Sequence, residues 1–498
     1  MKGRVTALTV IILLAFGLIL GQAVLVQVHR AAALNADPNN PRNTAAGTYF
    51  PRGEILSSNG TVLARSIPTS DAAHPWRRAY PLGSLTSDVV GYSSSYYGTG
   101  GAEYQYDTYL LSHAQPPRSI SQVLSPVRSS DTLHLTLEIA LQQVASRELA
   151  GRDGAVVALD PRDGSVLAMY SNPGYSPAPL ASTNVSIQKT AWKEYITKNA
   201  NGFPPLGNVA TQETFPPGST SKVVTTAAVF RYWPGLSLKS YPSVSFINLP
   251  QSNVPLYNSG GGACGGTIYE MLPPSCDPGF ASVGLDLGGT RLANQANQFG
   301  YNSTPPLDLP GVVPSFFDSA NALIDDPPFL AYAAIGQGNV RATALQDALI
   351  AAGIANQGKV VGPHVMASIT DSLGNTVAKW HPAVWRRPLG PVQDAQIVPM
   401  MQNVVKYGTA AGIFLPQDDV AAKTGTAQAA ANTKTDDWMI AFAPATHPLI
   451  AVAVVVPFQT LAGWGATVAG PIVKCMIEAQ LAIDSGQPPA NTATTCPA

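Results

Sequence analysis

The stretch FPPGSTSKVVTTAAVF, Phe215 to Phe230, places a lysine at the start of an apolar segment, three residues after a serine. Two prolines and a glycine precede the serine and predict a turn that leads into a helix. Residues three apart on a helix share a face, so we expect the Ser219 hydroxyl and the Lys222 amine to be neighbours. The segment Val223–Phe230 carries no charge, so we expect this helix to be buried.

This placement predicts a nucleophile beside a base. Burial disfavours the charged form of a lysine and therefore lowers the pKa of Lys222. A neutral amine next to the Ser219 hydroxyl can take its proton, and the N-terminus of a helix favours a developing anion. A second Ser-x-x-Lys pattern, Ser186 to Lys189, lies in a polar stretch without an apolar helix behind it, so the context favours Ser219.

A second element, AAKTGTAQ, has the composition of a carboxylate-binding strand. It offers a cation, two hydroxyl groups and a glycine that admits close approach. A strand N–H here is suited to complete an oxyanion hole with the N–H of Ser219. The residues concerned are Lys423, Thr424, Gly425 and Thr426.

The composition indicates a loop-rich extracellular globular protein. The chain has 498 residues, of which 12% are charged and 45% hydrophobic, with 44 glycines and 43 prolines. Its length predicts two or three domains, and its apolar content argues against disorder. A net charge of -1 provides no field that would hold nucleic acid. We therefore expect no nucleic-acid partner.

One stretch near the N-terminus, Val5 to Val28, has 24 residues without a charge. It is longer than the apolar region of a cleaved signal peptide, so we expect a retained transmembrane helix. Lys2 and Arg4 precede the stretch, but Arg30 follows it closely, so the positive-inside signal is weak. We expect the short N-terminus in the cytoplasm and the rest of the chain outside.

The pattern along the chain predicts an α+β fold, with a mostly antiparallel sheet flanked by helices. A glycine cluster at Gly98–Gly101 is interpreted as a turn and not as a phosphate loop. Strands are expected at 132–137, in a hairpin within 155–170 and twice within 437–457, with helices at 138–150, 223–230 and 472–483. The predicted segments are a cytoplasmic stub and anchor (1–28), an accessory domain of short strands (29–129), the main domain (130–484) and a tail (485–498).

The chain has four cysteines, and an even count in an oxidising compartment suggests disulfides. Pairing of Cys264 with Cys276 and of Cys475 with Cys496 is the simplest of the three possible connectivities, and buried free thiols are the alternative. The sequence contains no Cys-x-x-Cys and no paired histidines, so we expect no metal and no cofactor.

Ser-x-x-Lys followed by Lys-Thr-Gly is the signature of serine β-lactamases and penicillin-binding proteins. Over nearly its whole length, the chain resembles a class B penicillin-binding protein, closest to the actinobacterial D,D-transpeptidases of cell division and shape. Weaker motifs of the family also match. They are RGEILSSNGTVLA (Arg52 to Ala64), GAE (Gly101 to Glu103) and AIGQGNVRATALQ (Ala334 to Gln346).

The third catalytic motif of that family, Ser-x-Asn, is altered here to Ser275-Cys276-Asp277. By resemblance, Ser275 passes a proton to the leaving amine, and Asp277 replaces an amide that contacts Lys222 and the substrate. A carboxylate has no N–H donors, and its charge favours protonated Lys222, a poorer base. Literal Ser-x-Asn patterns begin at Ser182, before the nucleophile, and at Ser319, in a proline-rich run, and both are discounted.

The resemblance implies a penicillin-binding/β-lactamase-like transpeptidase domain with a smaller β-rich accessory domain of the pedestal or dimerisation type. It also implies an anchored serine acyltransferase that crosslinks peptidoglycan stem peptides and is acylated by β-lactams. Its expected partners are the cytoplasmic membrane and the divisome or other cell-wall synthesis proteins. The roles expected are nucleophile for Ser219, base for Lys222, proton delivery for Ser275 and Lys423, and substrate binding for Asp277, Lys423, Thr424, Gly425 and Thr426.

Two other interpretations stay open at this point. A D,D-carboxypeptidase or β-lactamase would use water in place of the acceptor amine. A non-catalytic protein, either a penicillin sensor or a divisome scaffold, is suggested by Asp277 in the third motif.

Overall fold

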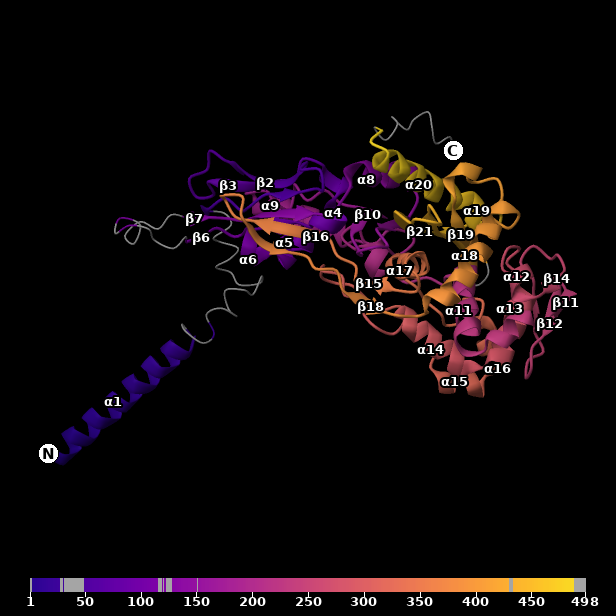
Figure 1. Cartoon of the computed structure of the whole chain (residues 1–498). Coiled ribbons are helices and arrows are strands. Elements are labelled where there is room, and N and C mark those ends of the chain that lie inside the picture. The colour runs from indigo at the N-terminus through magenta and orange to yellow at the C-terminus, as the bar shows by residue number, and fades with distance from the viewer. Residues whose placement is uncertain are drawn as a thin grey trace.

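The computed structural model describes residues 2–26, 30, 49–114, 119, 121, 128–149, 151–429 and 433–487. The body is elongated, with a six-stranded sheet in one half and a five-stranded sheet in the other (Figure 1). Helices and strands are mixed along the chain, so the predicted α+β class is confirmed.

The larger half is built on an antiparallel sheet in the order β10-β9-β21-β20-β19. The predicted hairpin and the two late strands are confirmed as parts of this sheet. Strand β19 carries the Lys-Thr-Gly motif at the edge of the sheet. The strands are β9 (Gly154–Leu159), β10 (Val166–Asn172), β19 (Ala421–Ala429), β20 (Lys434–Ala443) and β21 (Ile450–Gln459).

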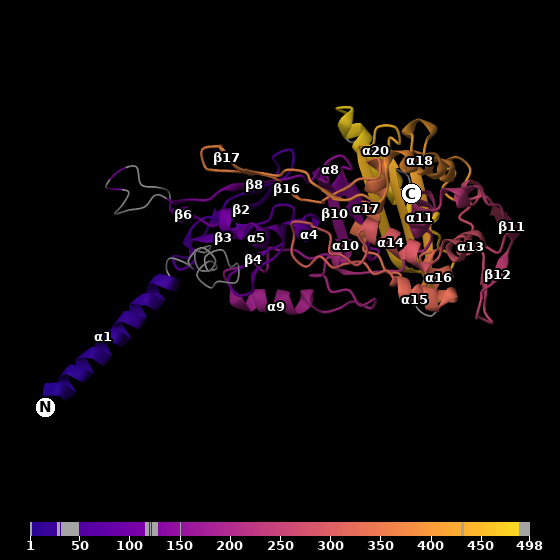
Figure 2. The same ribbon diagram turned by 60° about the horizontal axis from the view of Figure 1, so that its bottom comes forward.

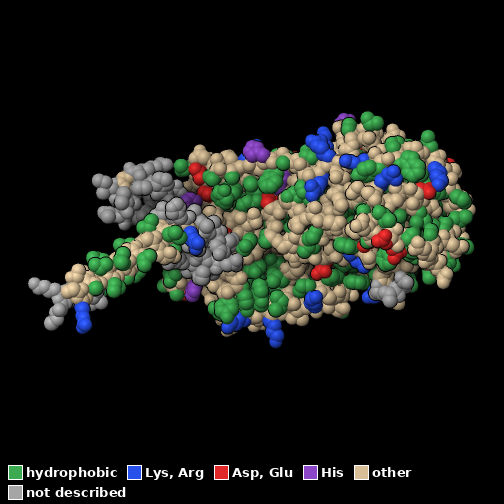
Figure 3. Space-filling view, turned by 90° about the horizontal axis from the view of Figure 1, so that it is seen from below, with side chains coloured by type: hydrophobic (Ala, Val, Ile, Leu, Met, Phe, Trp, Pro, Cys, Tyr) green, Lys and Arg blue, Asp and Glu red, His purple; other side chains and the backbone are tan. Residues whose placement is uncertain are grey.

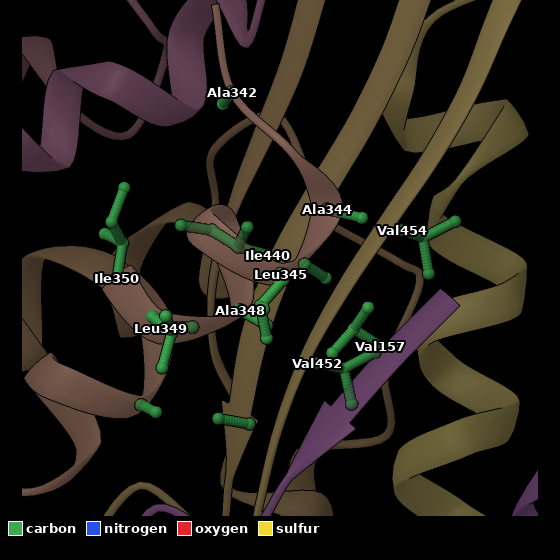
Figure 4. Packing of buried hydrophobic residues seen from close by; sticks show 14 of the residues in the cluster. Val157, Ala342, Ala344, Leu345, Ala348, Leu349, Ile350, Ile440, Val452 and Val454 are labelled. Carbon is green, nitrogen blue, oxygen red and sulfur yellow. The ribbon is translucent and has the colours of Figure 1, made fainter. Parts of the chain in front are cut away.

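Helices cover both faces of this sheet, which explains why β9 is buried along its whole length. Helix α17 (Ala344–Ala355) packs on β21, β9 and β20. Helices α8 (Ile139–Leu149) and α20 (Gly470–Asp484) pack against each other and cover the other face (Figure 1). Leu345 and Ala348 of α17 lie over the apolar side chains of the sheet (Figure 4).

The apolar helix predicted at 223–230 is α11 (Lys222–Tyr232), preceded by the 3-10 turn η3 (Gly218–Ser221). It is buried from Lys222 to Phe230 among neighbouring helices. These neighbours are α13 (Asp277–Leu287), α14 (Gly289–Phe299) and α18 (Pro391–Lys406), and α12 (Ile268–Met271), α15 (Ala320–Asp325) and α16 (Pro327–Ala333) complete this helical layer.

The six-stranded sheet, in the order β17-β16-β8-β1-β2-β3, combines distant parts of the chain. A hairpin from beyond residue 360 pairs with β8, beside the N-terminal strands (Figure 2). The sheet thus unites strands from both predicted domains, whose boundaries stay predictions. Its strands are β1 (Ile55–Leu56), β2 (Val62–Pro68), β3 (Trp76–Ala79), β8 (Thr132–Leu135), β16 (Met366–Thr370) and β17 (Thr376–Lys379).

A buried ion-pair cluster joins two of the weak motifs of the N-terminal region. Glu103 of the GAE motif contacts Arg52 of the Arg-Gly motif at 2.9 Å and Arg78 at 2.5 Å, and Arg52 also contacts Asp107 at 2.7 Å. Gly98 lies in strand β5 and Gly101 begins α5, so the turn expected at these glycines lies instead at residues 95–97.

The remaining elements are short or lie in connections. They are η2 (Gly83–Leu85), α4 (Ser87–Val90), β4 (Ser93–Ser94), β5 (Gly98–Thr99), α5 (Gly101–Gln105), α6 (Asp107–Leu110), β6 (His113–Ala114), β7 (Arg128–Ser129), α9 (Val185–Tyr195), α10 (Val209–Gln212), η4 (Pro234–Leu238), β11 (Tyr241–Val244), β12 (Phe246–Asn248), β13 (Pro255–Tyr257), β14 (Cys264–Gly266), β15 (Val360–Val361), β18 (Val384–Arg386), η5 (Pro416–Asp418) and α19 (Gly465–Val468).

The N-terminal stretch forms the helix α1 (Lys2–Val24). Among the helices that the structure describes, however, none combines the length and the apolar character needed to cross a membrane. The predicted transmembrane anchor therefore stays a prediction. Helix α1 contains Val5 to Val24 of the uncharged stretch.

Charged side chains are scattered over the face seen in the space-filling view, as the low charge content predicts (Figure 3). Blue and red side chains occur singly or in small groups between apolar and uncharged ones. This face therefore offers no extended charged patch.

Leu345→Ala is expected to lower the free energy of unfolding by about 2–5 kcal/mol, because Leu345 is 0% exposed between α17 and the sheet. Chemical denaturation followed by circular dichroism measures the change. Leu373→Ala is the control, because Leu373 is 72% exposed and its truncation is expected to cost less than about 0.5 kcal/mol. Equal losses in the two variants would contradict the packing described.

Candidate active site

The turn η3 brings the predicted nucleophile and base together. Ser219 lies in this 3-10 turn, in which side chains three residues apart are eclipsed. The Lys222 Nζ atom is 3.0 Å from the Ser219 Oγ atom. The predicted proximity is thus present, although a 3-10 turn and not an α-helical turn produces it.

A close backbone approach holds this turn against the edge strand β19. A Cβ atom on Gly425 would lie 2.6 Å from the carbonyl oxygen of Pro217, so a side chain there would push the turn away. The Trp438 indole on β20 donates to the Pro216 carbonyl at 2.9 Å. Gly218 has a φ of 56° and faces Thr426. The glycine of the Lys-Thr-Gly motif is therefore required by packing.

The two lysines converge on Ser275. The Ser275 Oγ atom is 2.8 Å from the Nζ atom of Lys423 and 3.2 Å from that of Lys222. Lys222 also donates to the Ser275 carbonyl oxygen at 2.6 Å. Both lysines are 0% exposed. The structure therefore brings Ser219, Lys222, Ser275 and Lys423 into one cluster.

Asp277 forms an ion pair with Lys222. Its Oδ1 atom is 2.6 Å from the Lys222 Nζ atom. The backbone N–H of Ser259 donates to its Oδ2 atom at 2.9 Å, and its own N–H donates to the Asn258 side chain at 3.0 Å. The carboxylate thus has a defined position. No pattern in the sequence around residues 258–259 predicted these two partners.

The predicted disulfide between Cys264 and Cys276 is confirmed, with an S–S distance of 2.06 Å. It fixes the segment that carries Ser275, which has a φ of 63°, a conformation uncommon for residues other than glycine. Cys475 is also disulfide-bonded, and its predicted partner, Cys496, lies outside the described residues.

The electrostatics of the cluster lower both lysine pKa values. Burial lowers the pKa of Lys222, and the neighbouring Asp277 carboxylate opposes this shift. Burial, followed by repulsion from Lys222, lowers the pKa of Lys423 well below its usual range. Asp277 therefore favours the proton on Lys222, and Lys423 is the lysine that loses its proton more readily.

An open cleft of about 830 Å³ lies in front of this cluster. Ser219, Asp277 and Thr426 reach its wall, and Tyr257 and Trp464 are among its apolar boundaries. The hydroxyl of the nucleophile is therefore accessible while its base is shielded from solvent.

The two threonines of the β19 motif differ in whether their hydroxyl groups can reach a ligand in the cleft. Thr426 lines the cleft, and its Oγ1 atom accepts a hydrogen bond from the Gly465 N–H at 2.9 Å, which leaves its hydroxyl hydrogen for a ligand. Thr424 is 6% exposed, and its Oγ1 atom lies 2.6 Å from that of Thr409. Thr426 is thus the hydroxyl placed to meet a substrate directly.

The discounted serines have local roles. The Ser319 side chain caps the N-terminus of α15, accepting from the Ala322 N–H at 3.3 Å. The Ser182 hydroxyl accepts from the Asn184 N–H at 3.1 Å. Ser186 is exposed on α9, and Lys189 lies over the Tyr96 ring. Their contacts agree with the choice of Ser219 and Ser275.

The described part of the chain contains no group of three or more His, Cys, Asp or Glu side chains able to hold a metal ion.

Two family models match this chain. The penicillin binding protein transpeptidase domain matches residues 154–478, and the penicillin binding protein A dimerisation domain matches residues 52–129. The first match covers more than half of the chain. The chain belongs to the penicillin-binding proteins.

Relatives of this penicillin-binding protein match over nearly their whole length. The peptidoglycan D,D-transpeptidase PbpA of Mycolicibacterium smegmatis is 33% identical, with 97% of this chain and 99% of the relative covered. The PbpA of Mycobacterium tuberculosis is 32% identical with the same coverage. The structure of penicillin-binding protein A from M. tuberculosis as a ceftriaxone acyl-enzyme complex is 31% identical, with a TM-score of 0.79, 89% of this chain and 100% of that chain covered.

Proposed function

We propose that this penicillin-binding protein is a serine D,D-transpeptidase that crosslinks peptidoglycan stem peptides and is acylated by β-lactams. The observation that carries the proposal is the contact of the Ser219 hydroxyl with a buried lysine at the wall of an open cleft. Relatives named as peptidoglycan D,D-transpeptidases and a structural neighbour described as a β-lactam acyl-enzyme support it.

In the acylation step, the Ser219 oxygen attacks the carbonyl carbon of the penultimate D-alanine while its proton passes to the neutral amine of Lys222. The backbone N–H groups of Ser219 and Thr426 stabilise the oxyanion. The carbon–nitrogen bond then breaks, and the departing D-alanine amine receives its proton through the Ser275 hydroxyl. The Thr426 hydroxyl, backed by Thr424 and the charge of Lys423, holds the terminal carboxylate.

The acyl group then passes to an amine of a neighbouring stem peptide. The amine attacks the ester carbonyl and loses a proton to Lys222. The bond to the Ser219 oxygen breaks, and the serine regains a proton. A β-lactam follows the first half of this path, because opening of its ring forms the same serine ester.

The Ser275 hydroxyl provides the route by which Lys222 becomes a base. In the resting site, Asp277 holds the proton on Lys222, whereas burial and repulsion from Lys222 favour neutral Lys423. Ser275 lies within hydrogen-bond distance of both nitrogens. It can donate its proton to Lys423 and accept one from Lys222, so the charge moves without a large side-chain movement.

We further propose that the cleft works outside the cytoplasmic membrane, with the membrane surface and cell-division or wall-synthesis proteins as partners. Peptidoglycan is an extracytoplasmic polymer. The Cys264–Cys276 disulfide supports this location, because disulfides persist in oxidising compartments.

A hydrolase is the second candidate, because the open cleft also admits water to the acyl-enzyme. Incubation with a stem pentapeptide and an amine acceptor distinguishes the two functions. We expect the crosslinked product to exceed the hydrolysed tetrapeptide, whereas free acid alone would identify a carboxypeptidase. A scaffold without activity would give neither product.

Ser219→Ala is expected to abolish labelling of the full-length protein by a fluorescent penicillin, because Ser219 is the hydroxyl that, among the described residues, contacts a buried lysine at the wall of the cleft. In-gel fluorescence at equal protein concentration measures the labelling. Ser186→Ala, in the exposed Ser-x-x-Lys pattern of α9, is the matched control and should label like the parent. Undiminished labelling of Ser219→Ala would disprove the assignment of the nucleophile.

Asp277→Asn is expected to move the acidic limb of the pH profile of labelling to lower pH by about 1–3 units. The carboxylate raises the pKa of Lys222, so its removal extends the neutral amine to lower pH and increases the rate near neutrality. Asp286→Asn, which removes a carboxylate paired with Lys239 at the surface, is the control. An acidic limb that stays in place, or moves to higher pH, would refute the coupling of Asp277 to Lys222.

A further inference from the structure

Behind the turn that carries Ser219 lies a carboxyl group that the reaction described above does not use. Asp347, on α17, is 0% exposed. Its Oδ2 atom is 2.7 Å from the Oγ1 atom of Thr220, the residue after the nucleophile. Its Oδ1 atom has no hydrogen-bond partner in the described part of the chain.

The hydrogen bonds of Thr220 determine the state of this carboxyl group. The Thr220 Oγ1 atom is also 3.0 Å from the carbonyl oxygen of Pro217. A threonine hydroxyl has one hydrogen, and both a carbonyl and an ionised carboxylate can only accept. Both contacts are therefore hydrogen bonds only when Asp347 is protonated and donates to Thr220, which in turn donates to Pro217.

The surroundings of Asp347 also favour the neutral form. Within the described ranges, no lysine, arginine or histidine pairs with it, and burial raises its pKa to about 7. The titratable group that faces it from another element is Tyr301, after α14, and burial raises the pKa of that phenol so that it is uncharged. From η3, the facing side chain is the uncharged hydroxyl of Thr220.

We propose that Asp347 is a positioning residue whose protonated form holds the Ser219 turn through Thr220 and Pro217, and whose ionisation loosens that turn. When the carboxyl group loses its proton, its oxygen and the Pro217 carbonyl compete for the single hydrogen of Thr220. The turn then loses one of its internal contacts.

Other contacts also hold this turn, and they connect a loss of the Thr220–Pro217 hydrogen bond to the position of Ser219. The backbone N–H of Gly218 donates to the Gly336 carbonyl at 3.0 Å, and Phe215 pairs with Ala342 just before α17 begins. The segment from Gly336 into α17 thus supports the turn from one side, while β19 packs on the other. A change at Asp347 is transmitted to Ser219 without contact with the substrate.

The test is the pH dependence of labelling by a fluorescent penicillin in the full-length protein. This readout rests on the proposed function, because it requires acylation of Ser219 by a β-lactam. Asn in place of Asp347 keeps an N–H donor to Thr220 but cannot ionise. Between pH 6 and pH 8, we expect the labelling rate of the parent to fall by about tenfold relative to that of Asp347→Asn. If the parent and Asp347→Asn gave pH profiles of labelling with the same shape, the proposal would be overturned.

Two controls separate positioning from a general effect of buried carboxyl groups. Asp394, on α18, is 4% exposed, and burial raises its pKa to about 8, but it does not contact the turn. Asp394→Asn should therefore retain the pH dependence of the parent. Thr220→Ser keeps the hydroxyl and should retain the pH dependence of labelling. Thr220→Val removes the hydroxyl and should abolish this pH dependence. If Asp347→Asn does not fold, the comparison of Thr220→Ser with Thr220→Val still tests whether the contact with Asp347 positions the turn.

An independent readout distinguishes failure of this proposal from failure of the proposed function. At pH 6, we expect the infrared spectrum of the parent to contain the C=O band of a protonated carboxyl that Asp347→Asn lacks. Absence of that band would overturn the proposal even if Ser219 is acylated normally. A parent that is never labelled but shows the band would disprove the transpeptidase function alone, and would leave the protonated contact to Thr220 supported.

Discussion

Two lysines are buried completely around one serine hydroxyl, with a single carboxylate to balance them, and this arrangement constrains the rest of the site. Two ammonium groups this close repel each other and lose their hydration, so the cluster favours one proton fewer than two free lysines would hold. Asp277 determines which nitrogen keeps its proton at rest, and Ser275 lies where the proton can be exchanged. The reactivity of Ser219 thus depends on the charge balance of the whole cluster and not on Lys222 alone.

The fold holds this cluster from three directions. The antiparallel sheet places β19 at its edge, where Gly425 lets the Ser219 turn approach the strand closely. The burial of α11 places Lys222 beneath that turn, away from solvent. The Cys264–Cys276 disulfide and the Ser259 N–H fix the segment that carries Ser275 and Asp277. Each support comes from a different part of the chain, so the site forms only when the larger half of the molecule is folded.

The sequence predicts what depends on short-range spacing and does not predict long-range contacts. The Ser219–Lys222 contact follows from a separation of three residues, and the strands β9, β10, β20 and β21 follow from apolar runs bounded by turns. The addition of β16 and β17 to the N-terminal sheet is not visible in the sequence, because strand pairing is set by tertiary packing. The Asp347–Thr220 contact was missed for the same reason, since a single aspartate in an apolar helix does not reveal its partner.

Mapping the site of covalent attachment tests the central claim most directly. The full-length protein is incubated with benzylpenicillin and digested, and its peptides are sequenced by tandem mass spectrometry. Ring opening transfers every atom of the antibiotic, so the account predicts an increase equal to the mass of intact benzylpenicillin, located on Ser219. The same adduct on Ser275, Ser186 or any other residue, with an unmodified Ser219, would contradict it.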